Sequence, residues 1–471
     1  MAQVDRVLER IAEQGIQMID VKFVDVLGML HHLTVPVGAV DAEQLSEGFV
    51  FDGSSIRGFR GIAESDMILR PDLSTAVCDP FVEGPTLSLM GDVMESGLKE
   101  YGRDPRGVAR RAERYLRESG VADVSYWGVE MEFFVFDNVR FQAGPDASFY
   151  YVDSDEAHWN SGRVPNGGYK VKHQQGYLRA LPIDDQTNLR TAMVRQLQAM
   201  GLVVERHHHE VASAGQNEIN FRFSTLVDTA DKAVLYKYVV KNVARAHGKT
   251  ATFMPKPLYG HSGSGMHCNQ SLAKDGVNLF YDPNGYANLS QLALWYIGGL
   301  LHHASALLAI TNPTTNSYKR LVPGYEAPVS LVFSRANRSA AIRIPVSLSA
   351  RTTRIEFRTP DPSANPYLAL AAQLMAGLDG IRRRIDPSAA GFGPVDVDIY
   401  RLPDAALVQL KQAPASLREA LEALKADHEF LLEGDVFSED LIEAFIALKE
   451  EEIRKLETHP HPVEFEMYYD N

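Results

Sequence analysis

The stretch Trp127–Phe136 constrains this chain most, because it places two acidic residues inside an otherwise apolar run. Side chains of an extended strand alternate between its two faces, so Glu130 and Glu132 point the same way. Phe134 and Phe136 share that face, which indicates that it is partly enclosed. Two enclosed carboxylates repel each other unless a cation neutralises them. The pattern therefore favours a buried strand beside a divalent metal ion; a solvated acidic face is the alternative.

Composition and charge narrow the class of protein. The chain has 471 residues, 45% hydrophobic and 23% charged, which is typical of a globular protein with two or three domains. Its net charge of -14 argues against nucleic acid or an anionic membrane surface as a partner. Cys78 and Cys268 are too few for a disulfide framework, and residues 1–15 have an amphipathic helix pattern and not that of a signal peptide. We expect a cytoplasmic protein without a transmembrane segment.

Helix and turn signals divide the chain near residue 103. Helical spacing that stops at Gly15 precedes two short alternating stretches, which predicts a small sheet with one helix. Asp104 and Pro105 then have the pattern of a helix cap and first turn. We therefore expect one domain at 1–103 and a larger one at 104–471.

The larger domain is predicted to contain further strands with one polar face. Residues 217–223 and 353–358 alternate between apolar and polar side chains, and helices are expected near 228–247, 289–311 and 366–385. An antiparallel sheet covered by these helices would curve its polar face into a cavity, which gives an α+β fold class. A polar segment at 142–176 is predicted to be a long surface excursion.

The polar faces offer oxygen-rich metal ligands, which suit Mg²⁺ or Mn²⁺ better than a thiolate-preferring zinc ion. His207, His208 and His209 suggest zinc as an alternative, but adjacent strand residues face opposite ways, so at most two could share an ion. The candidate ligands are Glu130, Glu132, Glu210, Glu218, Glu356 and His267.

Arginines crowd residues 320–358. Guanidinium groups bind carboxylates and phosphates through paired hydrogen bonds, although a solvated basic patch is the alternative. Metal ions beside arginines favour phosphoryl transfer, because both neutralise charge on the transferred group. The chain has no Gly-x-x-x-x-Gly-Lys-Ser/Thr motif, so a P-loop enzyme is excluded. The cluster includes Arg320, Arg338, Arg343, Arg351, Arg354 and Arg358.

Several longer motifs are specific: Phe51–Ser55, Lys256-Pro257 leading to Gly263–His267, Asn312–Pro328 and Asn337–Ser339. With them the chain resembles a class I glutamine synthetase of the bacterial type along essentially its whole length. The resemblance implies that ATP phosphorylates the side-chain carboxylate of glutamate and that ammonia then displaces phosphate to give glutamine. It also implies a funnel-shaped site with two divalent ions, and a small β-grasp-like N-terminal domain.

The resemblance implies a role for each candidate residue. One metal ion would be held by Glu132, Glu210 and Glu218. The other would be held by Glu130, His267 and Glu356. The glutamate-binding residues would be Ser262, Gly263, Arg320, Glu326, Arg338 and Arg358. The ATP-binding residues would be Glu205, Phe223, Asn269, Ser271, Arg338, Arg343, Arg351 and Arg354. The catalytic residues would be Asp52, Glu326 and Arg338.

The resemblance implies specific roles for two of these residues, and one of them concerns the assembly. Glu326 resembles a loop glutamate that closes the site and takes a proton from the attacking ammonium. Asp52 resembles part of an ammonium-site loop that the neighbouring subunit contributes, which implies a homo-oligomer. The implied assembly is a dodecamer of two face-to-face hexameric rings, and the apolar tail Val463–Tyr469 resembles the segment that inserts into the opposite ring.

The chain departs from the family pattern at Ser262, Asn269 and Ala336, where members usually carry Asn, His and Arg. These departures put in question one glutamate contact and one phosphate contact, but no metal ligand. A ligase that joins glutamate to a larger amine and a non-catalytic nitrogen-sensing relative are the alternatives. Asp52 favours ammonium, because an anion helps to deprotonate a small cation whereas a larger amine needs room.

Tyr400 resembles the tyrosine that some bacterial members carry on an exposed loop for reversible adenylylation. Pro394 and Pro403 flank a segment without helical period, and the excursion at 142–176 resembles an insertion of that regulated subclass. Arg401 departs from the acidic residue that usually follows the tyrosine. If the modification occurs, an adenylyltransferase is a further partner.

Overall fold

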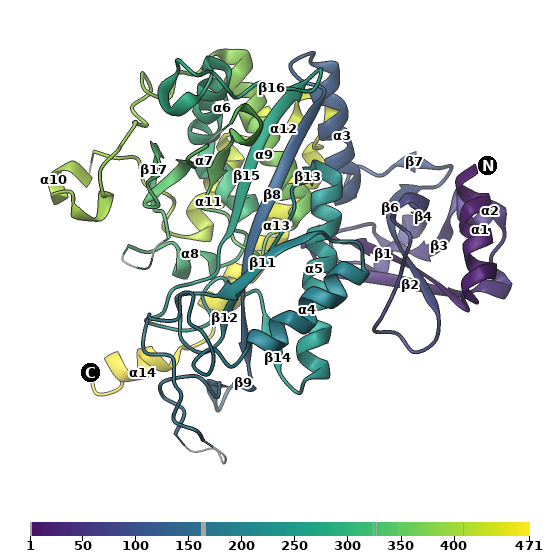
Figure 1. Ribbon diagram of the computed structural model, residues 1–471, viewed down its shortest axis with the longest axis horizontal. Helices are drawn as coiled ribbons and strands as arrows, with labels where there is room; N and C mark the ends of the chain where they lie inside the picture. The colour runs from purple at the N-terminus through teal and green to yellow at the C-terminus, as the bar shows by residue number, and fades with distance from the viewer. Residues whose placement is uncertain (1, 162–165, 324, 326, 348, 408) are drawn as a thin grey trace.

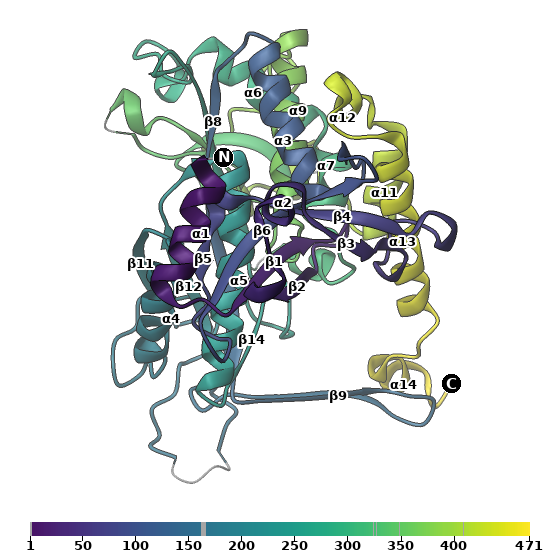
Figure 2. The same ribbon diagram turned by 90° about the vertical axis from the view of Figure 1, so that its right-hand side faces the viewer.

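A computed structural model of the chain contains two main β-sheets, a small one near the N-terminus and a larger one that is surrounded by helices (Figure 1). The structure describes residues 2–161, 166–323, 325, 327–347, 349–407 and 409–471. The N-terminal sheet lies to one side of the larger body in Figure 1 and in front of that body in Figure 2.

The N-terminal sheet follows α1 (Ala2–Gln14), which ends where Gly15 adopts a φ of 60°. Its strands are β1 (Met18–Val24), β2 (Leu30–Pro36), β3 (Phe49–Asp52), β4 (Asp66–Pro71), β5 (Val77–Cys78), β6 (Thr86–Glu95) and β7 (Lys99–Glu100). Their order is β2-β1-β6-β4-β3, with β5 and β7 paired to β6. The pair β1–β6 is parallel, and the other pairs are antiparallel. The predicted small sheet with a leading helix is confirmed, and a short second helix, α2 (Ala42–Glu47), is added to it.

The larger sheet is built around the strand that contains Glu130 and Glu132. Its strands are β8 (Val124–Phe136), β11 (Val204–His209), β12 (Gln216–Phe221), β13 (Ser224–Thr225), β14 (Thr250–Thr252), β15 (Met266–Lys274), β16 (Val277–Asn278), β17 (Ser330–Arg335), β18 (Ala340–Ile344) and β19 (Ile355–Phe357). The main order is β11-β12-β8-β15-β19-β18-β17. The antiparallel prediction is correct for the pairs around β8 and β15, but the outer pair β17–β18 is parallel.

Helices cover the apolar face of this sheet. The helices of this region are α3 (Pro105–Glu118), α4 (Thr187–Ala199), α5 (Leu226–Ala246), α6 (Gln291–His302), α7 (Ala304–Thr311), α8 (Ser317–Arg320) and α9 (Pro366–Arg383), of which α3, α4, α5 and α6 contact strands of the sheet directly. Towards the C-terminus follow α10 (Asp404–Leu407), α11 (Leu417–Ala426), α12 (Glu429–Leu432), α13 (Glu439–Glu457) and α14 (Pro462–Tyr468). Helices α6 and α9 pack closely because glycines face each other: a Cβ on Gly299 would lie 2.7 Å from the Gly380 backbone.

The two faces of β8 bury different side chains, as the alternation predicted. Trp127, Met131 and Phe133 belong to the main hydrophobic core. Phe134 and Phe136 stack at 5.6 Å and pack in a separate small cluster with Leu258. The glutamate face is therefore enclosed at one end by aromatic rings and not open to solvent along its length.

Two segments differ from the sequence prediction. The helix expected near 289–311 is two helices, α6 and α7, which meet at an angle of 73°. Among the residues that the structure covers, this bent pair has the length and composition of a membrane span, whereas none of the single helices does. Part of the excursion at 142–176 is ordered as a hairpin of β9 (Asn138–Ala143) and β10 (Ser148–Asp153), which reaches away from the body in Figure 2.

A buried arginine ties the two sheets together. Arg106 on α3 is 3% exposed and forms ion pairs with Asp72 (2.8 Å) and Asp92 (2.6 Å) from the N-terminal sheet region and with Asp231 (2.8 Å) on α5. Tyr367 on α9 donates a further hydrogen bond of 2.6 Å to Asp231. These contacts fix the N-terminal sheet against the helices that support β8.

Candidate active site

Strand register brings the predicted metal ligands together. Glu130 lies opposite His267 in the β8–β15 pair, and Glu132 lies opposite Glu218 in the β8–β12 pair. Glu356 on β19 lies opposite Asn269, two residues after His267. Residues that are directly opposite in an antiparallel pair have Cβ atoms about 5 Å apart. Side chains from four separate stretches of sequence therefore converge on one face of the sheet.

Glu130, His267 and Glu356 form the first ligand group. One donor atom from each lies within 4.8 Å of the others, and His267 Nδ1 is 3.6 Å from Glu130 Oε2 and 3.7 Å from Glu356 Oε1. Burial opposes ionisation of Glu130, but the hydrogen bond and charge of His267 outweigh it and lower the pKa to about 2. Burial, together with the charge of Arg358, lowers the pKa of His267. The group therefore offers carboxylates and a neutral imidazole, the protonation states that bind a cation.

Glu210 and Glu218 form the second group, with Glu132 beside them. Burial and the charge of Glu218 raise the pKa of Glu132 to about 8, and burial with the charges of Glu132 and Glu218 raises the pKa of Glu210. Glu132 Oε2 accepts hydrogen bonds from Gly265 N (2.9 Å) and Gln216 Nε2 (3.2 Å). Three carboxyl groups that repel each other in an enclosed site suit a hard divalent cation.

Sequence reasoning missed His208 in this group. Its donor atoms lie within 4.8 Å of those of Glu210 and Glu218, and its Nδ1 is 3.4 Å from Glu210 Oε1. The signal was present in the sequence, because residues 208 and 210 share one face of an extended strand. His209 points the other way and lies 2.7 Å from Glu156, so the three adjacent histidines do not share an ion.

The ligand groups adjoin two cavities. The first cavity, of about 520 Å³, is lined by all members of both groups except Glu356, together with candidates for glutamate binding, namely Ser262, Gly263, Arg320, Arg338 and Arg358. The second cavity, of about 770 Å³, is lined by candidates for ATP binding, namely Glu205, Phe223, Asn269, Ser271, Arg351 and Arg354. Glu130 and Arg206 line both cavities. Arg206, on β11, was not among the predicted site residues. Nothing in the sequence around it indicated that its side chain would line both cavities.

The arginines divide between supporting the site and lining it. Arg358 Nη1 donates to Glu356 Oε1 at 2.6 Å, and Arg343 pairs with the other oxygen of the same carboxylate. Arg320 donates to the carbonyl oxygens of Thr359 (2.7 Å) and Arg358 (3.2 Å). Arg358 Nε is buried without a hydrogen-bond partner in the part of the chain that the structure describes.

Two of the departures from the family pattern have partners in the structure. Ser262 Oγ accepts a hydrogen bond of 3.0 Å from Gln174 Nε2, and Ser262 N donates to Gln174 Oε1 at 3.2 Å. Asn269 Nδ2 donates to Glu130 Oε1 at 3.0 Å, and its Oδ1 accepts from Arg354 Nε at 2.9 Å. Asn269 therefore holds a metal-ligand candidate and an arginine of the larger cavity in fixed positions.

Asp52 does not line either of these cavities within one chain. Asp52 lies at the end of β3 in the N-terminal sheet, where its carboxylate accepts hydrogen bonds from Ser54 and Ser55. These bonds lower the pKa of Asp52. Glu326 lies outside the described residues. Tyr400 lies in a 3-10 turn, Ile399–Arg401, and its side chain is likewise outside the description.

The fold and the site define a class of protein in which a small N-terminal sheet is joined to a strongly curled sheet whose concave face carries acidic ligands and arginines. Residues 15–96 match the model of the glutamine synthetase β-grasp domain, and residues 102–468 match that of the glutamine synthetase catalytic domain. The chain belongs to the glutamine synthetase family.

Individual relatives are similar over nearly their whole length. The chain is 53% identical to a glutamine synthetase of Frankia alni over 98% of both chains, and 52% identical to that of Vibrio cholerae over 99% of both. Among solved structures, the electron cryomicroscopy structure of Plasmodium falciparum glutamine synthetase superposes with a TM-score of 0.90 at 28% identity, covering 99% of this chain and 98% of that one. The predicted family and fold class are confirmed.

Proposed function

We propose that this chain is an ATP-dependent glutamate–ammonia ligase. The γ-phosphoryl group of ATP passes to a side-chain carboxylate oxygen of glutamate. Ammonia then displaces phosphate from the side-chain carboxyl carbon, and the products are glutamine, ADP and phosphate. The observation that carries the proposal is the shared wall of the two cavities at Glu130 and Arg206. A nucleotide in the larger cavity and a glutamate in the smaller one would meet at this wall, beside both ligand groups.

The larger cavity is assigned to ATP. Phe223 is 56% exposed there and its ring stands edge-on to Tyr126 at 5.6 Å, an arrangement that offers an aromatic face to a base. Arg351 and Arg354 are assigned to the phosphates, since guanidinium groups bind phosphate oxygens through paired hydrogen bonds. Glu205, Asn269 and Ser271 complete the proposed nucleotide contacts, and Arg338 and Arg343 are assigned to the transferred phosphoryl group.

The smaller cavity is assigned to glutamate. Arg320, Arg338 and Arg358 are the proposed carboxylate partners, because all three line this cavity. The loop at Gly263 supports this assignment, because a Cβ there would lie 2.3 Å from Pro255 O and 2.9 Å from Arg320 Cγ. Only glycine lets the backbone pass this close to Arg320. Ser262 is the other proposed loop contact, and Glu326 is the proposed acceptor of the ammonium proton.

Two divalent ions are assigned to this site, one to Glu132, Glu210 and Glu218 and one to Glu130, His267 and Glu356. When bound, such ions supply positive charge beside the phosphates and the carboxylate. The raised pKa values of Glu132 and Glu210 support the assignment, since these carboxyls are hard to ionise together without a cation. The oxygen-rich donor set favours Mg²⁺ or Mn²⁺.

Asp52 is assigned to the ammonium site of a neighbouring subunit. Its exposed position and lowered pKa support this, because an ionised carboxylate outside its own chain's cavities is available to a second copy. The tail α14 supports an assembly of two hexameric rings, with Phe465 58% and Tyr469 83% exposed in the single chain. The exposed aromatic residues of the β9–β10 hairpin, such as Phe141, offer a second contact surface.

Three further assignments belong to the same proposal. The domains are 1–103 and 104–471. The enzyme acts in the cytoplasm. Tyr400, in its turn after Pro394, is the site at which an adenylyltransferase attaches AMP.

Release of phosphate from ATP, measured in the presence of glutamate and ammonium, tests the proposal. We expect turnover that needs all three substrates and a divalent ion, and glutamine as the product by mass. Methylamine and ethylamine in place of ammonium test the larger-amine alternative. If turnover is faster with either amine than with ammonium, that amine and not ammonium is the substrate. If there is no turnover with any of the three, the proposed ligase activity is wrong.

A further inference from the structure

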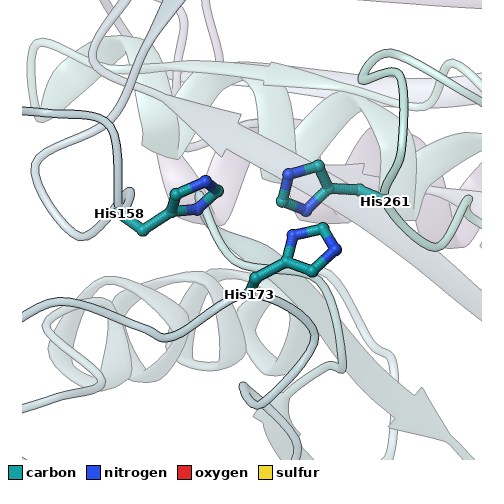
Figure 3. A group of neighbouring side chains, drawn as sticks. All are labelled: His158, His173 and His261. Carbon is teal, nitrogen blue, oxygen red and sulfur yellow. The ribbon is translucent and has the colours of Figure 1, made fainter.

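Three histidines outside the two ligand groups point toward one another (Figure 3). Their donor nitrogens lie within 4.8 Å of one another. The His173 and His261 rings are 4.6 Å apart, and the His158 ring lies 5.6 Å from each of them. His158 and His173 both lie in the connection between β10 and α4, and His261 lies in the loop before β15, so two separate segments supply the cluster.

The loops that carry the three rings are tied to each other. Val171 N donates to Glu156 O at 2.9 Å, which ties two parts of the connection between β10 and α4 to each other. Gln174 forms two hydrogen bonds with Ser262, which join this connection to the loop before β15. Ser213 Oγ lies 3.2 Å from His158 Nδ1 and 3.4 Å from His261 Nδ1, so one hydroxyl orients two of the rings. The backbone therefore holds the histidines in place before any ligand arrives.

We propose that His158, His173 and His261 form a binding site for a borderline divalent transition-metal ion such as Zn²⁺. Three imidazoles and a water molecule make a common tetrahedral zinc environment. Imidazole donors suit Zn²⁺, Ni²⁺ or Cu²⁺, whereas the carboxylate groups of the active site suit Mg²⁺ or Mn²⁺. The two kinds of site therefore select different ions.

The protonation state of the cluster supports binding. Burial and the charges of His173 and His158 lower the pKa of His261 to about 4, and burial and His173 lower the pKa of His158. As neutral imidazoles at neutral pH, His158 and His261 can bind a metal ion without first losing a proton. An aromatic stack is the competing explanation, since Trp159 lies edge-on to His261 at 5.7 Å. A stack has no need of donor nitrogens and predicts no metal binding.

A bound ion would fix the loop next to the glutamate cavity. His261 precedes Ser262 and Gly263, which line that cavity, and Lys256 Nζ donates to the His261 carbonyl oxygen. Ligation of His261 would therefore hold this loop against the excursion that carries His173. This consequence for glutamate binding rests on the proposed function, whereas the metal site itself does not.

Equilibrium dialysis of the whole protein with Zn²⁺, in saturating Mg²⁺ to occupy the carboxylate groups, tests the site. We expect one Zn²⁺ per chain in the wild type, with imidazole ligands by X-ray absorption. His173→Ala should weaken its affinity more than about tenfold. His173→Cys should retain binding, because a thiolate is also a zinc ligand. His247→Ala, at an exposed position after α5, is the matched control and should bind as the wild type does.

Hydrogen exchange provides a readout that does not depend on activity. Exchange at residues 261–263 should slow when Zn²⁺ is added to the wild type and to His173→Cys, and not in His173→Ala. The proposal is overturned if no Zn²⁺ binds in excess Mg²⁺, or if His173→Ala binds it as tightly as the wild type. If the protein binds Zn²⁺ as expected but shows no turnover, the proposed ligase activity is rejected and the proposed zinc site is retained.

Discussion

Without a divalent ion, the Glu132→Gln variant should be more stable than the wild type. With a divalent ion bound, the variant should be less stable than the wild type. Burial and Glu218 raise the pKa of Glu132 to about 8 from an ordinary value of 4.5. A carboxyl with a raised pKa binds more protons in the folded state than in the unfolded state. The free energy of unfolding therefore falls as pH rises between these two values.

The size of the effect follows from that difference in pKa. Each pKa unit corresponds to 1.36 kcal/mol, so at pH 7, where Glu132 ionises in the unfolded state but stays protonated in the folded state, the raised pKa lowers the free energy of unfolding by on the order of 3 kcal/mol. Glutamine has nearly the same volume, and its oxygen can still accept the hydrogen bond from Gly265 N. The metal-free variant should recover most of this free energy at pH 7 and little of it near pH 4.5.

A divalent ion should make the wild type more stable than the variant. An ion at 1,000 times its Kd stabilises the wild type by about 4.1 kcal/mol, and a thousandfold weaker variant at the same concentration gains only about 0.4 kcal/mol, so the ion's preference for the wild type exceeds the roughly 3 kcal/mol gained without it. Thermal unfolding of chelator-treated protein at several pH values, with and without Mg²⁺, measures both effects. Glu118→Gln, at an exposed position at the end of α3, is the control and should change neither.

Two results would refute the reasoning. One is a metal-free Glu132→Gln protein that is no more stable than the wild type at pH 7, since that would mean the carboxylates do not strain the empty site. The other is equal stabilisation of variant and wild type by Mg²⁺, since that would remove Glu132 from the ligands.

Asp52→Ala should raise the KM for ammonium far more than that for glutamate, and an equal rise in both would contradict its assignment. Glu326→Ala should keep ATP and glutamate binding by calorimetry but lose most glutamine formation, and near-normal turnover would reject its role as base. Arg106→Met should lower stability by about 3 to 5 kcal/mol by leaving buried carboxylates such as Asp231 unpaired, and an unchanged thermal midpoint would contradict this. Deleting residues 463–471 should give a smaller particle by light scattering with an unchanged circular dichroism spectrum, whereas an unchanged mass would place the tail outside the ring contacts.

Local sequence patterns determined much of the fold. Alternation in Trp127–Phe136 gave the enclosed glutamate face of β8, and Gly15 and the Asp104-Pro105 pair marked helix ends that the structure retains. These features depend on backbone geometry over a few residues, which the local sequence controls. The same reasoning failed between α6 and α7, where two helices bend apart at 73°, because tertiary packing sets that angle.

The candidate ligands could be chosen from the sequence by chemistry, and the resemblance sorted them into two groups. Their convergence was decided by the register of β8 with β12 and β15, which sets Glu132 opposite Glu218 and Glu130 opposite His267. The cluster of His158, His173 and His261 left no pattern in the sequence, because its members lie in irregular segments with no common period. Periodicity reports which face of its own strand or helix a side chain occupies, and only the packing of distant segments determines which side chains meet.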